Sequence, residues 1–188
     1  MSKTEIEKSA YHEAGHIVFA YLHGYRCKGV FIKPDGSGTT GLDYGTDKEL
    51  IQAIQVNVTN SDPYNLLQIE QKRRTSEAGG KMLEITLAGE IAETILIDDG
   101  KIDPKSLVAL QGPDLDDVLA VEQLFKDLKF HNDPHFIARH IKAVQAKIET
   151  LNIWPVIEAL ATAILAEPDN MLEQQDIEDV FSSTGFQY

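Results

Sequence analysis

His12-Glu13-Ala14-Gly15-His16 lies near the start of this 188-residue chain. On a helix, side chains four positions apart lie one above the other on the same face, so His12 and His16 can reach one metal ion together. Glu13 lies close enough to contact a water on that ion without binding the ion itself. Two histidines and a carboxylate in this order are typical of a helix that holds zinc and activates a water for hydrolysis.

The composition indicates an acidic globular protein. Hydrophobic residues make up 43% of the chain, charged residues 25%, and the net charge is −13. Nucleic acids and anionic lipids attract clustered Lys and Arg, so this balance argues against both as partners. The single cysteine, Cys27, excludes an internal disulfide and fits a reducing compartment. With no apolar run of ~20 residues and no signal-peptide core, the sequence predicts a cytoplasmic protein without a membrane segment.

The spacing of apolar residues predicts several helices and a small sheet. The first helix is expected to open with a capping box at Ser2-Lys3-Thr4-Glu5 and to end at Gly24. The β-prone run Gly29–Lys33, a turn segment and a second strand over 39–44 predict a hairpin beside the metal-binding helix. Residues 47–60 fit neither the helical nor the strand period. Further helices are expected over 63–75, 76–96, 114–128, 134–151, 154–166 and 173–181.

A single domain over residues 1–188 is expected. The chain has no internal repeat, low-complexity segment or linker that would separate a second domain. Residues 1–129 would carry the metal site, and residues 130–188 would form a C-terminal helical bundle. The predicted fold class is therefore mainly α, of the α+β type, with the small sheet beside the metal helix.

A third metal ligand is needed from elsewhere in the chain, because a catalytic zinc usually has three protein ligands and a water. The metzincin pattern would require Gly at position 19 and His at position 22, where the chain has Phe19 and Leu22, so that class is excluded. Two acidic segments remain: a predicted helix with Glu90 and Glu93, and a helix start with Asp114, Asp116 and Asp117. Spacing alone does not choose between them, and carboxylates at a helix N-terminus also serve as caps.

Several segments of the chain match, in order, the motifs of one known family. These are Ser9–His16, Val30–Pro34 with Thr40–Leu42, Leu87–Glu93, Gly112–Leu115 and Leu172–Ile177. They resemble motifs of the FtsH-type zinc metallopeptidase domain. The first segment resembles its active-site helix, and the second its substrate-side strand with the glycine-containing return. The last three resemble its Gly-Gly-Arg-x-Ala-Glu helix, its Asn-Asp-Leu segment and its closing Leu-Asp-Gly-Glu-Glu-Ile segment, in that order. The resemblance spans most of the chain, and its most specific motif is the first.

The resemblance implies a zincin-like peptidase fold with one zinc ion per chain. It implies that His12, His16 and Asp114 are the zinc ligands and that Glu13 is the general base. It also implies that Glu93 is a carboxylate near one of the histidines. The strand that faces the substrate would consist of Val30, Phe31, Ile32 and Lys33. Asp116 or Glu93 as the third ligand, and another divalent ion in place of zinc, stay open. A substrate strand could pair with the edge near Val30–Lys33 or with that near Thr40–Tyr44.

The sequence therefore predicts a zinc-dependent endopeptidase that hydrolyses peptides or unfolded proteins, with a metal-activated water and Glu13 as general base. Full-length family members carry membrane helices and an AAA ATPase module, which this sequence does not show, so activity without ATP is expected. The resemblance leaves room for a homo-oligomer and for an ATPase partner supplied in trans. The alternative is a peptidase-derived binding or regulatory module without turnover. Glu13 favours the enzyme, because such a module has no need of the base.

Overall fold

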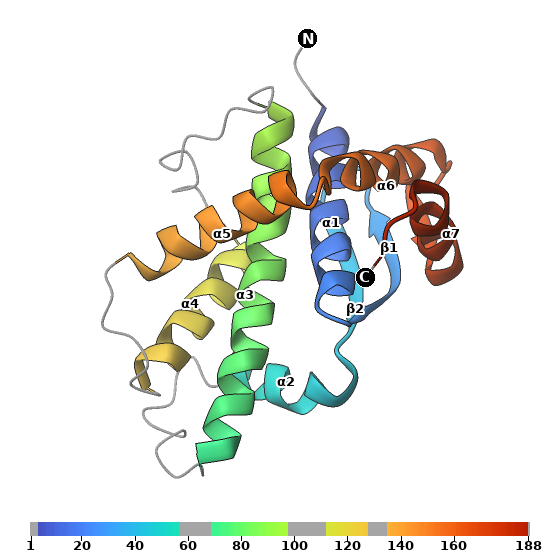
Figure 1. The fold of residues 1–188 in the computed structure, drawn as a ribbon. Coiled ribbons are helices and arrows are strands. Elements are labelled where there is room, and N and C mark those ends of the chain that lie inside the picture. The colour runs from blue at the N-terminus through green and yellow to red at the C-terminus, as the bar shows by residue number, and fades with distance from the viewer. Residues whose placement is uncertain (1–3, 57–68, 98–111, 128–134, 188) are drawn as a thin grey trace.

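The computed structural model describes residues 4–56, 69–97, 112–127 and 135–187 (Figure 1). Its elements are α1 (Glu5–Leu22), β1 (Arg26–Ile32), β2 (Gly38–Asp43), the short 3-10 helix η1 (Gly45–Asp47), α2 (Lys48–Val56), α3 (Ile69–Ile97), α4 (Gly112–Asp127), α5 (Phe136–Thr150), α6 (Trp154–Ala166), β3 (Met171–Glu173) and α7 (Gln174–Thr184). Most of the described residues are helical, and the three strands β1, β2 and β3 form one small antiparallel sheet. The expected α+β class is confirmed at this level.

Helix α1, which carries the H-E-x-x-H segment, begins and ends with specific caps. The Thr4 hydroxyl accepts a hydrogen bond from the Glu7 backbone N–H at 3.1 Å, and the Glu7 carboxylate accepts one from the Thr4 N–H at 2.8 Å. This capping box satisfies two backbone donors of the first turn. The box expected at Ser2-Lys3-Thr4-Glu5 begins outside the described residues. After the helix, Gly24 has a φ of 78°, a conformation that glycine adopts without strain.

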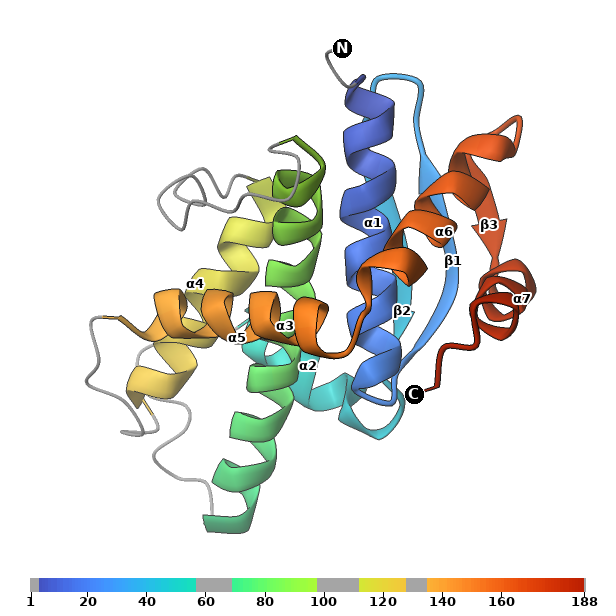
Figure 2. The ribbon, with the colours of Figure 1, turned by 45° about the horizontal axis from the view of Figure 1, so that its top comes forward.

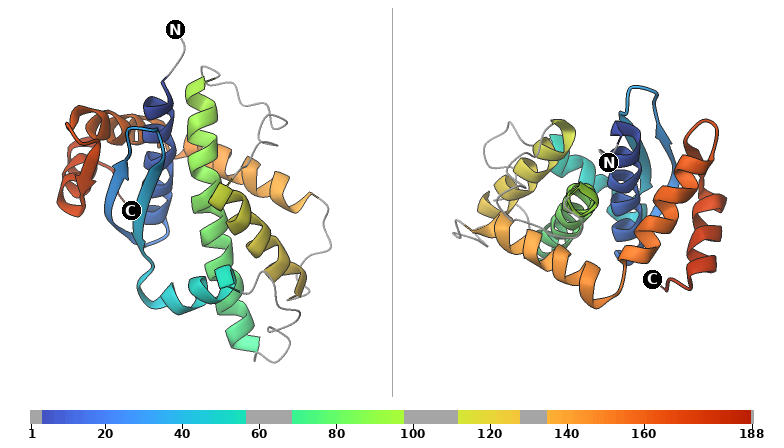
Figure 3. Two further views of the ribbon diagram at one scale, coloured as in Figure 1. Left: turned by 180° about the vertical axis from the view of Figure 1, so that it is seen from behind. Right: turned by 90° about the horizontal axis from the view of Figure 1, so that it is seen from above.

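The hydrophobic core surrounds α1. This helix lies between α3 on one side and the sheet and α6 on the other, as the view from above shows (Figure 3). The large side chains buried there include Ile17, Phe19, Tyr21, Ile32, Leu83, Leu87, Ile91 and Phe181. Each such side chain contributes about 1.5–3 kcal/mol by leaving water. Packing on both sides therefore fixes the orientation of α1.

The sheet has the strand order β2-β1-β3, and all pairs are antiparallel. Phe31 of β1 pairs with Thr39 of β2 on one side and with Met171 of β3 on the other. Strand β1 is therefore central, and β2 and β3 are the edges. The hairpin was predicted, but β3 was not, since three residues are too few for an alternating pattern to show.

Helices α2 and α3 differ from the sequence expectation. The part of residues 47–60 that the structure describes is helical, in η1 and α2. Two helices were expected over 63–75 and 76–96, whereas from Ile69 onward the described chain is one continuous helix, α3. Gly79-Gly80 lies inside it without ending it. Packing against α1 and α4 outweighs the low helix propensity of glycine there.

The C-terminal helices are distributed over the molecule instead of forming the expected bundle. Helix α5 packs on α3, α6 packs on α1, and α7 packs on α6 and β1 (Figure 2). Helical periodicity shows which face of a helix is apolar but not which neighbour covers it, so the bundle prediction was wrong. Within the described ranges no helix is by itself long and apolar enough to cross a membrane; α5 and α6 would reach that length only together, across a bend of 89°.

A charged cluster joins the C-terminal end of α1 to α3 and α5, away from the H-E-x-x-H segment. Glu84 of α3 accepts hydrogen bonds from His23 Nε2, at 2.8 Å, and from the Lys147 ammonium. Burial alone would raise the pKa of Glu84, but the two donors outweigh it and lower the pKa from its ordinary 4.5 to about 2. At a pH above 4.5, the ordinary pKa, the ionised carboxylate therefore stabilises the folded state. This stabilisation is lost as the pH falls from 4.5 towards 2.

We expect Glu84→Gln to lower the free energy of unfolding by about 1–3 kcal/mol at neutral pH. The variant should also lose less stability than the wild type on acidification, because the group that must be protonated is gone. Urea unfolding at about pH 7 and about pH 3 measures both effects. A variant that loses as much stability as the wild type between these pH values would contradict the role of Glu84.

Candidate metal centre

A cleft of about 480 Å³ lies where α1, β2, α3 and α4 meet. Its lining brings together His12, Glu13 and His16 of α1 with Glu93 of α3 and Asp117 of α4. The cleft thus brings together residues that are more than a hundred positions apart in the sequence, from His12 to Asp117. All three residues of the H-E-x-x-H pattern face it, as the helical spacing predicts.

The two histidine rings lie next to each other, and in each ring the Nδ1 atom contacts an oxygen atom of α3. Their centroids are 4.6 Å apart and the rings are nearly perpendicular, at 88°. His16 Nδ1 donates to the Ile85 carbonyl oxygen at 2.8 Å, and His12 Nδ1 lies 3.4 Å from Oε2 of Glu93. Because a carbonyl only accepts, the His16 proton is on Nδ1 and the lone pair is on Nε2. Glu93 favours the same tautomer of His12. Such outer contacts are typical of histidines that bind a metal through Nε2.

Two glycines allow α1 and α3 to approach closely at this point. A Cβ atom on Gly89 would lie 2.7 Å from Nε2 and 2.9 Å from Nδ1 of His16, which is closer than such atoms come. A Cβ atom on Gly15 would lie 2.8 Å from the carbonyl carbon of Ala88. The missing side chains therefore make room for the His16 ring and for the helix contact that positions it.

Glu13 is buried, with 6% of its surface exposed, and β2 packs against its carboxylate. The Thr40 hydroxyl donates a hydrogen bond to Glu13 Oε2. A Cβ atom on Gly38 would lie 2.8 Å from Cγ and from Cδ of Glu13. A buried carboxylate is costly unless it accepts hydrogen bonds, so β2 supplies both the donor and the space that keep it there.

The aspartates of α4 differ in what the structure shows of them. Asp114 lies in the first turn of α4, and its side chain is outside the described part of the structure. Asp116 is exposed, whereas Asp117 is half-buried and lines the cleft. Burial raises the pKa of Tyr44, a neighbouring cleft residue, to about 12, and the charge of Asp117 adds to this shift. In the described ranges no three His, Cys, Asp or Glu side chains are arranged to hold a metal ion.

The predicted substrate-side strand needs a correction. Val30, Phe31 and Ile32 belong to the central strand β1, and the Ile32 N–H also donates to the Asn170 carbonyl. Lys33 follows the strand and donates to the Ser37 carbonyl. A strand that is paired on both sides cannot accept another strand beside it. Of the two edges considered for substrate pairing, the one near Val30–Lys33 is therefore occupied by β3, which was not anticipated, and the one near Thr40–Tyr44 is that of β2.

The open edge next to the cleft is that of β2. This strand ends the sheet in the described ranges, since its only strand partner there is β1. Four of its residues line the cleft: Gly38, Thr39, Thr40 and Leu42. An extended peptide could therefore pair with β2 and lie beside the H-E-x-x-H segment.

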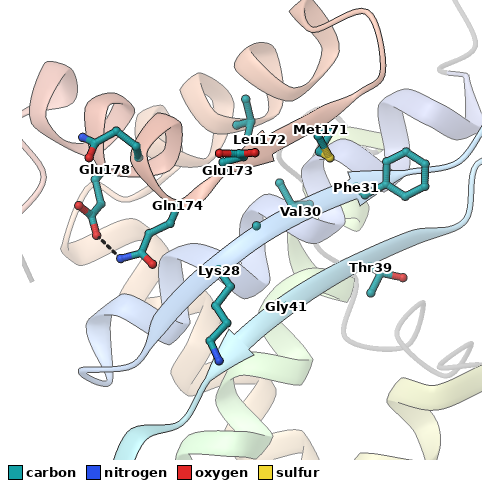
Figure 4. A pocket seen from close by; sticks show the side chains of 12 residues that line it. Lys28, Val30, Phe31, Thr39, Gly41, Met171, Leu172, Glu173, Gln174 and Glu178 are labelled. Carbon is teal, nitrogen blue, oxygen red and sulfur yellow. Dashed lines mark hydrogen bonds between the residues drawn. The ribbon is translucent and has the colours of Figure 1, made fainter.

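A second and larger groove, of about 790 Å³, lies on the exposed face of the sheet (Figure 4). Phe31 and Met171 border it, and both are exposed. On its α7 side, the Glu178 carboxylate accepts a hydrogen bond from Gln174. The described lining holds no histidine and no cysteine. The smaller cleft is therefore the candidate for metal chemistry.

No protein-family model matches the chain, and no curated protein matches it in sequence. The resemblance to FtsH-type peptidases is therefore an expectation from the motifs and their order alone.

Proposed function

We propose that this chain is a zinc-dependent endopeptidase that hydrolyses peptide bonds in extended or unfolded segments. The observation that carries the proposal is the orientation of the two histidines. The Ile85 carbonyl and the Glu93 carboxylate hold the Nδ1 sides, so the Nε2 atoms of His12 and His16 are the metal-binding atoms. A buried carboxylate, Glu13, shares their cleft.

The donor set fits zinc. Two imidazoles and one carboxylate are a common ligand set of hydrolytic zinc sites. His12 and His16 would be the first two ligands, and a carboxylate of α4 the third. The resemblance assigns this role to Asp114, while Asp117 is the α4 carboxylate observed in the cleft. When bound, the ion supplies Lewis acidity, which lowers the pKa of water to about 7 and polarises the scissile carbonyl.

The chain itself supplies the base and the alignment. Glu13 would accept a proton from the attacking water and pass it to the leaving amine. Main-chain hydrogen bonds from β2 would hold the substrate in an extended conformation across the cleft. Because such bonds do not depend on side chains, they suit substrates that are already unfolded.

Zinc affinity of single variants distinguishes Asp114 from Asp117 as the third ligand. We expect that either Asp114→Asn or Asp117→Asn will weaken zinc binding about 100-fold or more, because one anionic ligand is lost. Asp116→Asn is the matched control, since Asp116 is exposed on the same helix. Calorimetric zinc titration of the three variants gives the result directly. Wild-type affinity in both Asp114→Asn and Asp117→Asn would exclude these two aspartates as the third ligand, and wild-type affinity in all three variants would exclude the first turns of α4.

The function is tested by incubating zinc-loaded protein with casein, an unfolded substrate. We expect cleavage that stops when a chelator removes the metal and returns when zinc is restored. A zinc-loaded preparation that leaves casein intact would contradict the proposal. That result would favour the other candidate function, a peptidase-derived binding or regulatory module.

A further inference from the structure

Two residues of the edge strand β2 hold Glu13. The Thr40 hydroxyl donates to Oε2, and Gly38, which has no side chain, leaves room for Oε1, Cδ and Cγ. Positions 38 and 40 lie on the same face of the strand, because successive residues alternate between faces. Both residues line the cleft together with Glu13. Strand β2 therefore shapes the surroundings of this carboxylate from the side opposite α3.

The sheet register places the Thr40 hydroxyl where it needs a partner. Thr40 pairs with Val30, whose side chain is buried on the α1 side of the sheet. Its strand neighbours Thr39 and Gly41 lie on the other face and are exposed. A hydroxyl on the inner face must find an acceptor, and Glu13 is the acceptor that it has. The contact thus satisfies two polar groups at once.

We infer that Thr40 is a positioning residue that orients Glu13 for proton transfer; this inference rests on the proposed function. With Oε2 bound to the Thr40 hydroxyl, Oε1 is the oxygen that takes the proton from water and later gives it to the leaving amine. The hydroxyl can donate to Oε2 in both protonation states, because the carbonyl oxygen of a carboxylic acid still accepts. Glu13 then needs no rotation between the two proton transfers.

Kinetics of two Thr40 variants test this role. Thr40→Val keeps the shape of the side chain and removes the hydroxyl, so kcat for casein cleavage should fall about 10- to 100-fold. KM should stay within about twofold, because the substrate would pair with the main chain of β2, which the substitution leaves unchanged. Zinc affinity should not change, because the Thr40 side chain is not a metal ligand. Thr40→Ser restores the hydroxyl and should recover most of the rate. Thr150→Val, which removes an exposed hydroxyl at the end of α5, is the control.

A second measurement reports on the contact without turnover. In the metal-free protein, the Thr40 hydroxyl proton should exchange slowly enough to give an NMR signal, and Glu13→Ala should abolish that signal. A wild-type protein that cleaves casein while Thr40→Val cleaves equally well overturns this inference alone, as does a serine variant as slow as the valine variant. A wild-type protein without any cleavage overturns the proposed function instead, and the catalytic role of Thr40 falls with it.

Discussion

Glu13→Gln is expected to lower the rate of casein cleavage about 10²- to 10⁴-fold while the protein keeps its zinc. Glutamine has nearly the same size, and its carbonyl oxygen can still accept the hydrogen bond from Thr40. It cannot take a proton from water, so the loss isolates the proton-transfer step. Initial rates with labelled casein, together with the metal content of the same preparations, give the two required numbers.

A matched variant separates this effect from a general loss of charge. Glu158 is an exposed carboxylate on α6, and Glu158→Gln should cleave at the wild-type rate. A Glu13→Gln variant that keeps its zinc and cleaves within about tenfold of the wild type would show that Glu13 is not the base. A variant that loses zinc as well would point to a structural role for the buried carboxylate.

The second large effect is expected from a single added methyl group. Gly89→Ala places a Cβ atom 2.7 Å from His16 Nε2, so either the ring or helix α3 must move. Either movement takes the metal-binding nitrogen out of position, and we expect zinc affinity to fall about 10- to 100-fold or more. The crowding should also cost about 1–3 kcal/mol of stability.

The same helix provides the control for this variant. A Cβ atom on Gly80, also within α3, would meet no atom within 4 Å. Gly80→Ala should therefore keep wild-type zinc affinity and stabilise the protein by about 0.5–1 kcal/mol, the usual gain for alanine over glycine in a helix. If the stability change has opposite signs for Gly89→Ala and Gly80→Ala, helix propensity cannot be the cause, because it would favour alanine at both sites. Equal zinc affinity for Gly89→Ala and the wild type would contradict the proposed position of His16.

The parts of the site that the sequence predicts are those that one helix contains. His12, Glu13 and His16 follow from the spacing along α1 alone, because the helix repeat determines which side chains share a face. Glu93 was named from the resemblance, and the structure places its carboxylate 3.4 Å from His12. Whether it supports a metal ligand stays a prediction.

Other parts depend on packing that no local pattern encodes. The support of His16 by Ile85 spans 69 residues, and the contact of Thr40 with Glu13 spans 27 residues. Both need the close approach of α1 to its neighbours, which at α3 depends on the missing side chains of Gly15 and Gly89. Alternation along β2 does place Thr40 on the inner face, but the partner that it meets there follows only from the tertiary fold.

The errors in the fold prediction have the same origin. Strand β3 is short and lies directly before α7, so its residues carry no period-two signal of their own. It pairs with β1 at Gly29, Val30 and Phe31, which turns an expected edge into the centre of the sheet. Of the two edges considered for substrate pairing, the one near Val30–Lys33 is therefore covered, and the one near Thr40–Tyr44 borders the cleft.

We propose that His12 and His16 bind one metal ion, and metal analysis of the purified chain tests this proposal. After exposure to zinc and dialysis, about one zinc ion is expected per wild-type chain and almost none in His16→Ala. Circular dichroism should show that both proteins are equally helical. A wild-type chain that retains no zinc, or a His16→Ala variant that retains as much as the wild type, would show that these histidines do not form a zinc site.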